Sequence, residues 1–289
     1  MYNDYVIADR RIRFVGPQSD LAAAGLRSFA PFAVEYDPEA ETAVEIETGP
    51  YNGAPNFEEL TRFDFGEEAT VCRFGRIGNE YVLVIGEERR GRGATFVYDI
   101  DARRVKCDIG TRLPYVRFGL WSMANIALAP HLTAAVHASA IVHNGEAVVF
   151  LGESGTGKST HARLWLENIE GAEPLNDDSP FVTVTDGRPV AFGSPWSGKT
   201  PRYKNERYPL RAAVRLSQAP HNSIRRLRGA RAVGALLPSL PPAFAYDDRL
   251  ENLMLDTLSA IVNAVPVYHL ECRPDAEAAR LVHDTIFGI

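Results

Sequence analysis

The sequence has little lysine. Of its 31 lysine and arginine residues, only four are lysine: Lys106, Lys158, Lys199 and Lys204. Arginine otherwise meets this chain's need for positive charge. Each lysine position is therefore more informative than it would be in an average protein.

Cysteine and net positive charge are also scarce. The three cysteines, Cys72, Cys107 and Cys272, are widely spaced and include no CxxC pair, which argues against a disulfide framework or a zinc site. The formal net charge is −6, so the chain lacks the overall basic field expected of a protein that binds nucleic acid. We therefore expect reduced thiols and no nucleic-acid partner.

The first residues, MYNDYVIADRRIRF, carry charge where a signal peptide needs an apolar run, which predicts a cytoplasmic protein. Residues 118–145 contain no Asp, Glu, Lys or Arg. Two interpretations of that stretch are open, a membrane span and a buried helix that leads into a buried strand. The polar residues and the proline within it, Asn125, Pro130 and His131 among them, favour the second, so no membrane partner is expected.

Residues 1–111 are predicted to form a mostly β domain whose role the sequence does not define. Short runs of β-branched and aromatic residues alternate there with turn signals such as Gly78-Asn79 and Asp101. The predicted strands are residues 5–8, 12–15, 32–36, 43–47, 70–74, 81–85, 95–98 and 104–109.

From residue 112 the pattern becomes mixed α/β, and we expect a second domain over residues 112–289. Apolar residues at helical spacing predict helices over residues 113–128, 162–169, 250–262 and 275–287. Hairpins are predicted at residues 144–145 and 185–188, and apolar strands at residues 147–151, 212–216 and 265–270. Residues 195–210 contain three prolines and are expected to be a loop.

Residues 152–159, Gly-Glu-Ser-Gly-Thr-Gly-Lys-Ser, match the phosphate-binding pattern G-x-x-x-x-G-K-[ST]. The glycines let backbone N–H groups turn inward around phosphate oxygens, the lysine reaches the β and γ phosphates, and the serine hydroxyl ligates Mg²⁺. The following helix directs its positive N-terminal end at the anion. We expect ATP and Mg²⁺ as cofactors. The residues predicted to contact the nucleotide are Gly152, Glu153, Ser154, Gly155, Thr156, Gly157, Lys158, Ser159 and Thr160.

The same pattern occurs a second time, at residues 193–200. The first match follows an apolar strand and begins an amphipathic helix, which is the context that the pattern requires. The second contains Pro195 and Trp196 and runs into Thr200-Pro201, where a helix cannot begin cleanly. Only the first match is therefore predicted to be a phosphate-binding loop.

A phosphotransferase also needs a carboxylate for the metal and a base for the nucleophile. Asp177 and Asp178 are the candidates, after the helix of the loop and just before a predicted strand. Phosphate-loop proteins usually place the metal-binding Asp after four apolar residues, whereas Glu-Pro-Leu-Asn precedes this pair. A solvated turn is the alternative, because Asn-Asp-Asp-Ser-Pro is favourable turn chemistry.

Three segments in this order, His137-Ala-Ser-Ala, the loop at residues 152–159 and Asn176-Asp177-Asp178, resemble the catalytic domain of HPr kinase/phosphorylase and its wider family, which shares a core with phosphoenolpyruvate carboxykinase. The resemblance covers residues 112–289. It implies a phosphoenolpyruvate-carboxykinase-like P-loop domain, preceded here by the mostly β domain. It also implies a homo-oligomer.

Carried over by position, the resemblance implies that Asp177 is the general base for a serine-type hydroxyl. Asp178 and Ser159 would hold Mg²⁺, directly or through water. Lys158 would act on the transferred phosphate, and His137 would lie against the Asp pair and tune it. The chemistry agrees, because a carboxylate beside a metal and phosphates can accept a hydroxyl proton in line with the γ-phosphate. A purely structural role for His137 is the alternative.

The segment after the Asp pair departs from the family. HPr kinase carries a glutamate-containing signature there, whereas residues 193–199 of this chain contain no glutamate. Lys199 and Arg202, in a basic segment that is otherwise expected to be solvated, are predicted to offer charge to the nucleotide phosphates. The acceptor is therefore expected to differ from HPr.

The leading hypothesis is an ATP-dependent kinase that acts on a hydroxyl of a protein, a peptide or a small molecule. Two alternatives stay open. One is a carboxykinase-type enzyme that acts on a small carboxylic acid, and the other is a nucleotide-binding regulatory protein without turnover.

Overall fold

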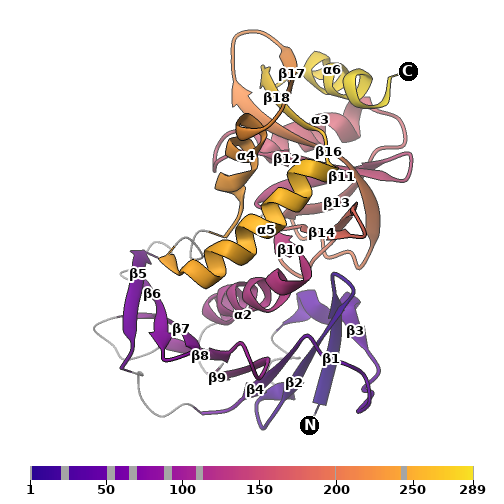
Figure 1. Ribbon diagram of the computed structural model, residues 1–289. Helices are drawn as coiled ribbons and strands as arrows, with labels where there is room; N and C mark the ends of the chain where they lie inside the picture. Colours follow the sequence, from indigo (N-terminus) through magenta and orange to yellow (C-terminus); the bar gives the residue numbers. More distant parts are fainter. Residues whose placement is uncertain are drawn as a thin grey trace. The chain divides into compact units, whose positions relative to one another are not determined.

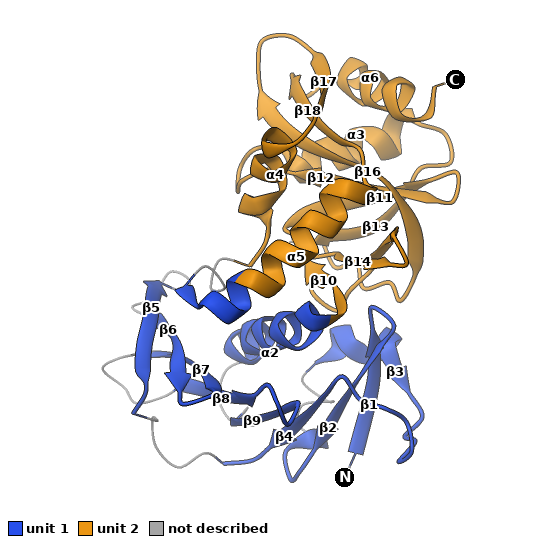
Figure 2. Cartoon of the chain, viewed as in Figure 1, with its two compact units in different colours: residues 1–130, 243–251 blue, residues 131–242, 252–289 orange. Residues whose placement is uncertain are grey.

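The structure is a computed structural model that describes residues 2–20, 26–50, 56–64, 70–87, 93–108, 113–198, 200–241 and 246–288. The chain divides into two compact units, which Figure 2 shows in different colours. Unit 1 comprises Met1–Pro130 and Ala243–Glu251, and unit 2 comprises His131–Pro242 and Asn252–Ile289. Large sheets and few helices give the mixed α/β class that the sequence predicts.

Unit 1 is built on a nine-stranded sheet of order β3-β1-β2-β4-β9-β8-β7-β6-β5 (Figure 1). The neighbours of β4 are parallel to it, and the other pairs are antiparallel. The strands are β1 (Tyr2–Ile7), β2 (Arg10–Val15), β3 (Ala33–Val34), β4 (Val44–Thr48), β5 (Glu58–Asp64), β6 (Thr70–Ile77), β7 (Glu80–Glu87), β8 (Gly93–Asp99) and β9 (Arg104–Asp108).

Helix α2 (Leu113–Leu128) packs against this sheet and belongs to unit 1, although the sequence pattern changes at residue 112. Gly119 permits the close approach, because a Cβ atom there would overlap the ring of Phe96 on β8. The hydroxyl groups of Tyr115 and Thr70 lie 2.9 Å apart in the same buried layer. Residues 118–145 therefore continue from a buried helix into buried strands, as the sequence predicts. No helix in the described part of the chain has the length and apolarity needed to cross a membrane.

Unit 2 contains a second sheet, of order β10-β14-β15-β16-β12-β11-β13, to which β18 adds beside β16 and β17 beside β18. Its strands are β10 (Thr133–Ala135), β11 (Ala138–His143), β12 (Glu146–Leu151), β13 (Glu173–Asp178), β14 (Phe181–Thr185), β15 (Arg188–Phe192), β16 (Arg207–Gln218), β17 (Ser223–Leu227) and β18 (Val267–Cys272). Its helices are α3 (Lys158–Asn168), α4 (Ala230–Leu236), α6 (Ala276–Phe287) and most of α5 (Asp248–Ala264).

Helices α3 and α6 pack together over β12 and β16 and form the core that fixes the start of α3. Trp165 of α3 is fully buried against Phe150 of β12, with ring centroids 5.6 Å apart. Val282 of α6 and Val214 of β16 complete the same apolar cluster. Burial of this face of α3, rather than intrinsic helix propensity, is what stabilises an 11-residue helix.

The structure confirms the four predicted helices and both predicted hairpins. Asn144 and Gly145 both adopt positive φ, as a two-residue hairpin turn requires. The predicted loop over residues 195–210 is wrong at its end, because β16 already begins at Arg207. The predicted strand over residues 32–36 is reduced to Ala33–Val34, which follows a 3₁₀ helix containing Pro31.

Candidate active site

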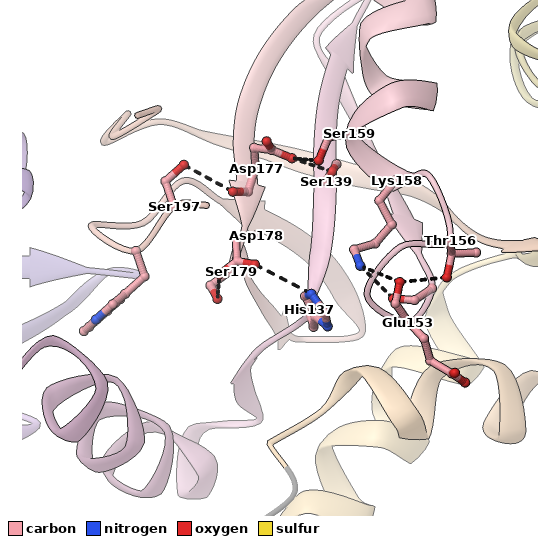
Figure 3. Close-up of polar contacts among 12 residues, drawn as sticks. His137, Ser139, Glu153, Thr156, Lys158, Ser159, Asp177, Asp178, Ser179 and Ser197 are labelled. Atoms are coloured by element: carbon pink, nitrogen blue, oxygen red, sulfur yellow. Dashed lines mark hydrogen bonds and ion pairs between the residues drawn. The ribbon is translucent and has the colours of Figure 1, made fainter. Parts of the chain in front are cut away.

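The register of the strands brings the predicted site residues together at one edge of the unit 2 sheet, the edge formed by the ends of β12 and β13. Ala138, the first residue of β11, pairs with Leu151 at the end of β12 and with Asp178 at the end of β13. His137 precedes Ala138, and the glycine loop directly follows Leu151. The three segments that carry the resemblance therefore meet at one sheet edge (Figure 3).

Asp177 and Asp178 are the last two residues of β13. They precede β14, as the sequence predicts, but they also end a strand that the sequence does not predict, so the alternative that they form a solvated turn is wrong. Pro174 is tolerated because β13 is the outermost strand of the sheet, where a missing backbone donor costs little. A register irregularity also lies beside it. The strand end holds both carboxylates beside the loop.

The glycine loop, residues 152–157, connects β12 to α3. Gly155 (φ +82°) and Gly157 (φ +107°) adopt conformations that side chains disfavour. Helix α3 begins at Lys158, and no side chain caps its N-terminus. The first turn of a helix leaves backbone N–H groups without helical partners, and the helix dipole favours an anion there. The loop and the helix together therefore have the form of a phosphate site.

The Lys158 side chain lies inside the curve of the loop. Its Nζ donates hydrogen bonds to the carbonyl oxygens of Gly152, at 2.8 Å, and Glu153, at 3.2 Å. Burial lowers the pKa of Lys158, while the carboxylates of Asp178 and Asp177 act in the opposite direction. The amino group is thus held between the loop and the Asp pair, where it can reach a phosphate bound in the loop.

Asp177 is joined to the loop through a serine hydroxyl. Its Oδ1 accepts hydrogen bonds from Ser139 of β11, at 2.6 Å, and from Ser159 of α3, at 2.9 Å. Figure 3 shows the two hydroxyls converging on this carboxylate. Ser139 pairs with Asp177 across the two strands, so the sheet register itself sets one of these contacts.

His137 lies beside the other carboxylate, with its Nε2 3.6 Å from Oδ1 of Asp178. Burial is the largest influence on the His137 pKa and lowers it, Lys158 lowers it further, and Asp178 opposes both. The environment therefore favours a neutral imidazole. Asp178 also has φ +140°, in a region that residues other than glycine rarely adopt. Such strain is typical of functional positions.

The second sequence match, residues 193–200, leads into β16, and two of its residues hydrogen bond to the backbone of Asp177. Gly198 N–H donates to the carbonyl oxygen of Asp177 at 2.5 Å, and Ser197 Oγ donates to the same oxygen at 3.2 Å. Gly193 is needed for packing, because a Cβ atom there would overlap the carbonyl oxygen of Lys204. The prediction that this match is not a second phosphate loop is consistent with these contacts.

A pocket of about 240 Å³ opens beside Asp177. The residues that line it are Ser159, Thr160, Ala162, Arg163, Asn176, Asp177, Thr200 and Arg202. Arg202 thus shares a pocket with Ser159 and Asp177, as its predicted role requires. Lys199 lies outside the described residues, so its prediction stays open. The pocket has room for an acceptor group next to a carboxylate.

The donors near the loop fit Mg²⁺. Mg²⁺ prefers oxygen ligands and keeps several waters, so it is usually held by one or two carboxylates together with substrate phosphates. Ser159 offers a hydroxyl, and Asp177 and Asp178 offer carboxylates at the same sheet edge. Within the described residues, no group of three or more His, Cys, Asp or Glu side chains could hold a metal ion by itself. The site therefore suits a metal that shares its ligands with a bound nucleotide.

Two contributors to the site were not predicted from the sequence. Ser139 belongs to the segment that begins at His137, but its sequence position gives no sign that it faces Asp177. The strand register shows that it does. Asn176 is 1% exposed, and its Nδ2 donates to the carbonyl oxygen of Trp196 at 3.0 Å while its Oδ1 accepts from Ser179 N–H at 2.9 Å. Its position immediately before the Asp pair is the only sequence signal.

A scan against protein-family models gives no match for this chain, and a search of curated proteins gives none either. The assignment of a function therefore rests on the site.

Proposed function

We propose that this chain is an ATP-dependent kinase that transfers the γ-phosphate to a hydroxyl group of a protein, a peptide or a small molecule. One observation carries the proposal. Asp177 is hydrogen bonded at 2.9 Å to Ser159, the serine of the glycine loop. A candidate base and the candidate phosphate site are thereby joined, and a kinase needs the base for its acceptor beside the phosphate that is transferred.

Ser159 and Asp178 are the residues that we assign to Mg²⁺, with Asp177 close enough to orient the serine. When bound, Mg²⁺ supplies positive charge that neutralises the β and γ phosphates. Lys158 supplies a second positive charge from inside the loop. Arg202 is assigned to the phosphate oxygens on the pocket side.

In the proposed transfer, the acceptor oxygen bonds to the γ-phosphorus while the bond from that phosphorus to its bridging oxygen breaks, and the electron pair leaves with ADP. The acceptor proton passes to Asp177. Oδ1 of Asp177 already accepts hydrogen bonds from Ser139 and Ser159. Among the described residues, none donates to Oδ2, so we assign the proton to Oδ2.

His137 acts on the second carboxylate. A neutral imidazole with its Nε2 3.6 Å from Oδ1 of Asp178 limits the space of that carboxylate without removing its charge. A carboxylate that keeps its charge is a better ligand for Mg²⁺. We therefore assign His137 as a positioning residue and not as the base.

The resemblance to the HPr-kinase-like family supports the same assignment, and with it a phosphoenolpyruvate-carboxykinase-like arrangement of unit 2. The ordered trio of His137, the glycine loop and the Asp pair shares one sheet edge. The absence of glutamate from residues 193–198 supports an acceptor other than HPr.

Two measurements on the full chain test the proposal. Calorimetric titration with MgATP should show binding, and an ADP-release assay should show turnover that rises with one member of a panel of hydroxyl acceptors, such as serine-containing peptides and free serine. Absence of binding would overturn the assignment of the loop. Binding without turnover on any acceptor, or on water, would favour the regulatory alternative.

A further inference from the structure

A second and larger pocket lies on the other side of the start of α3, and the proposed chemistry does not use it. Its volume is about 740 Å³. Gly155, Thr156 and Gly157 of the loop form one wall. The pocket beside Asp177 borders Ser159, Ala162 and Arg163 of α3, whereas this pocket borders His161 and Leu164. Thr160 lines both. The two pockets therefore flank the same helical turn.

The larger pocket lies where three neighbouring parallel strands end. Strand β16 runs parallel to both β12 and β18. The loop follows β12, Ala219 and Pro220 follow β16, and Arg273 and Pro274 follow β18. All of these segments line the pocket. Ligands of α/β sheets bind outside the carboxyl ends of parallel strands, so this edge is where the remainder of a loop-bound ligand is expected.

Contacts within this edge fix the loop relative to the two following strands. Gln218 at the end of β16 donates from Nε2 to the carbonyl oxygen of Gly155 at 3.2 Å. Ala219 N–H donates to the carbonyl oxygen of Cys272 at 3.0 Å. Arg215 of β16 pairs with Glu153 of the loop at 3.1 Å. The pocket wall is thus continuous from the loop to β18.

The chemistry of the walls suits a nucleoside. Leu164 and Leu216 are buried apolar side chains, and the exposed Pro220 and Pro274 add apolar rings. No acidic residue is among those that line the pocket. The volume lies within the range of roughly 300–1,000 Å³ that small-molecule sites occupy. Among the described residues that line the two pockets, a carboxylate next to the serine of the loop occurs in the one beside Asp177, so we assign the acceptor to that pocket.

We propose that this pocket holds the nucleoside of the bound nucleotide, with the base packed among Leu164, Leu216, Pro220 and Pro274. The inference rests on the proposed function, because it takes the polyphosphate to lie in the glycine loop. The phosphate chain then crosses the first turn of α3, with its γ end at Asp177 and its nucleoside end beyond Thr160.

The first test compares two probes on the full chain, MgATP and magnesium tripolyphosphate, which lacks the nucleoside. Ala219 is half-buried at the rim, and Ala219→Phe adds bulk to the pocket without removing a contact. We expect this variant to bind MgATP about tenfold or more weakly and tripolyphosphate unchanged. Ala219→Ser, which keeps the small side chain, should bind MgATP more tightly than Ala219→Phe does. Unchanged ATP affinity in Ala219→Phe would overturn the proposal.

A second measurement needs no substitution and decides the outcome if Ala219→Phe disturbs the loop itself. Cys272 lines the pocket and is half-buried, whereas Cys72 and Cys107 are buried. Burial raises the pKa of the Cys272 thiol, so alkylation by iodoacetamide is followed at mildly alkaline pH by peptide mapping. ATP should slow alkylation of Cys272 and tripolyphosphate should not.

Equal protection by ATP and by tripolyphosphate, or none by bound ATP, would place the nucleoside elsewhere. Failure of the loop assignment on which the proposed function rests has a different signature, since neither probe would then bind. The Cys272→Ser variant, which should lose the protected adduct from the peptide map, identifies the labelled site.

Discussion

Ser159, the second residue of α3, donates a hydrogen bond of 2.9 Å to Asp177 at the end of β13. The two residues come from segments separated by a whole helix, and they meet because β12 and β13 both pair with β11 and end at the same edge. Hydrogen-bond partners behind a metal ligand orient that ligand. The same carboxylate has a second oxygen, to which we assign the substrate proton.

The substitution Asp177→Asn should abolish phosphate transfer while leaving MgATP binding largely intact. The amide keeps the shape and can still accept from Ser139 and Ser159, but it is no longer a base. General-base catalysis contributes about 10²–10⁴ to the rate, so we expect a loss of that order in an ADP-release assay. Transfer at the wild-type rate would contradict the base assignment.

Asp178→Asn provides the matched comparison for that experiment. It removes the same charge from the neighbouring residue, which we assign to Mg²⁺. The variant should raise the Mg²⁺ concentration needed for half-maximal rate, and excess Mg²⁺ should partly restore activity. Excess Mg²⁺ should not rescue Asp177→Asn. Rescue of both variants to the same extent would mean that the two carboxylates share one role.

The substitution Lys158→Ala should weaken MgATP binding by at least about tenfold, because it removes a buried positive charge from inside the loop. Lys204→Ala is the control, since it removes a lysine whose contacts are Glu173 and Glu206. Calorimetric titration of both variants measures the difference. Equal affinities for the two variants would remove the support for phosphate binding in the loop.

Sequence reasoning reached the glycine loop because its signals are local. An apolar strand, positive-φ glycines and an amphipathic helix are each readable within a few residues, and residues 147–169 fold accordingly. Strand β13 was missed because Pro174 and the Asn-Asp-Asp run favour a turn locally, and only pairing with β11 overrides that preference. Strands β5 and β17 were missed because charged side chains dilute their apolar pattern.

The site shows the same division between local and non-local information. The loop residues and the Asp pair were found from short motifs, whereas the contacts of Ser139 and Asn176 depend on register and on a return of the chain some 20 residues later. Residues 193–200 match the phosphate-loop pattern, yet Ser197 and Gly198 donate hydrogen bonds to the backbone carbonyl oxygen of Asp177. The pattern of residue types in a segment does not show which strand end that segment will contact.

Asn176→Ala should destabilise unit 2 by about 1–3 kcal/mol, because the Trp196 carbonyl oxygen and the Ser179 N–H lose a hydrogen-bond partner. The Asn176 amide bonds the carbonyl oxygen of Trp196 and the N–H of Ser179 from a buried position. Asn168→Ala is the control, since that half-buried side chain makes a single bond to the Leu164 carbonyl oxygen. Urea unfolding of both variants checks the prediction, and a wild-type midpoint for Asn176→Ala would refute it.

His161 should make the stability of the protein depend on pH. The side chain is 3% exposed, packs edge-on against Phe150 with centroids 4.7 Å apart, and leaves its Nε2 without a hydrogen-bond partner within the described residues. Burial lowers the pKa of His161 from its usual 6.5 to about 4. In the unfolded chain the imidazole regains its usual pKa, so the unfolded state binds a proton at a higher pH than the folded state does.

The sign of the effect follows from that difference. The contribution of His161 is fully present above about pH 6.5 and is lost as the pH falls toward 4, because protonation then favours the unfolded state. Between pH 7 and pH 5 the loss should be about 2 kcal/mol in the free energy of unfolding. Urea titrations of the wild type, of His161→Gln and of His221→Gln, an exposed control, measure it. His161→Gln should lose about 2 kcal/mol less than the wild type over this range, whereas His221→Gln should follow the wild type. An unchanged pH dependence in His161→Gln would show that the buried imidazole titrates as it does in water.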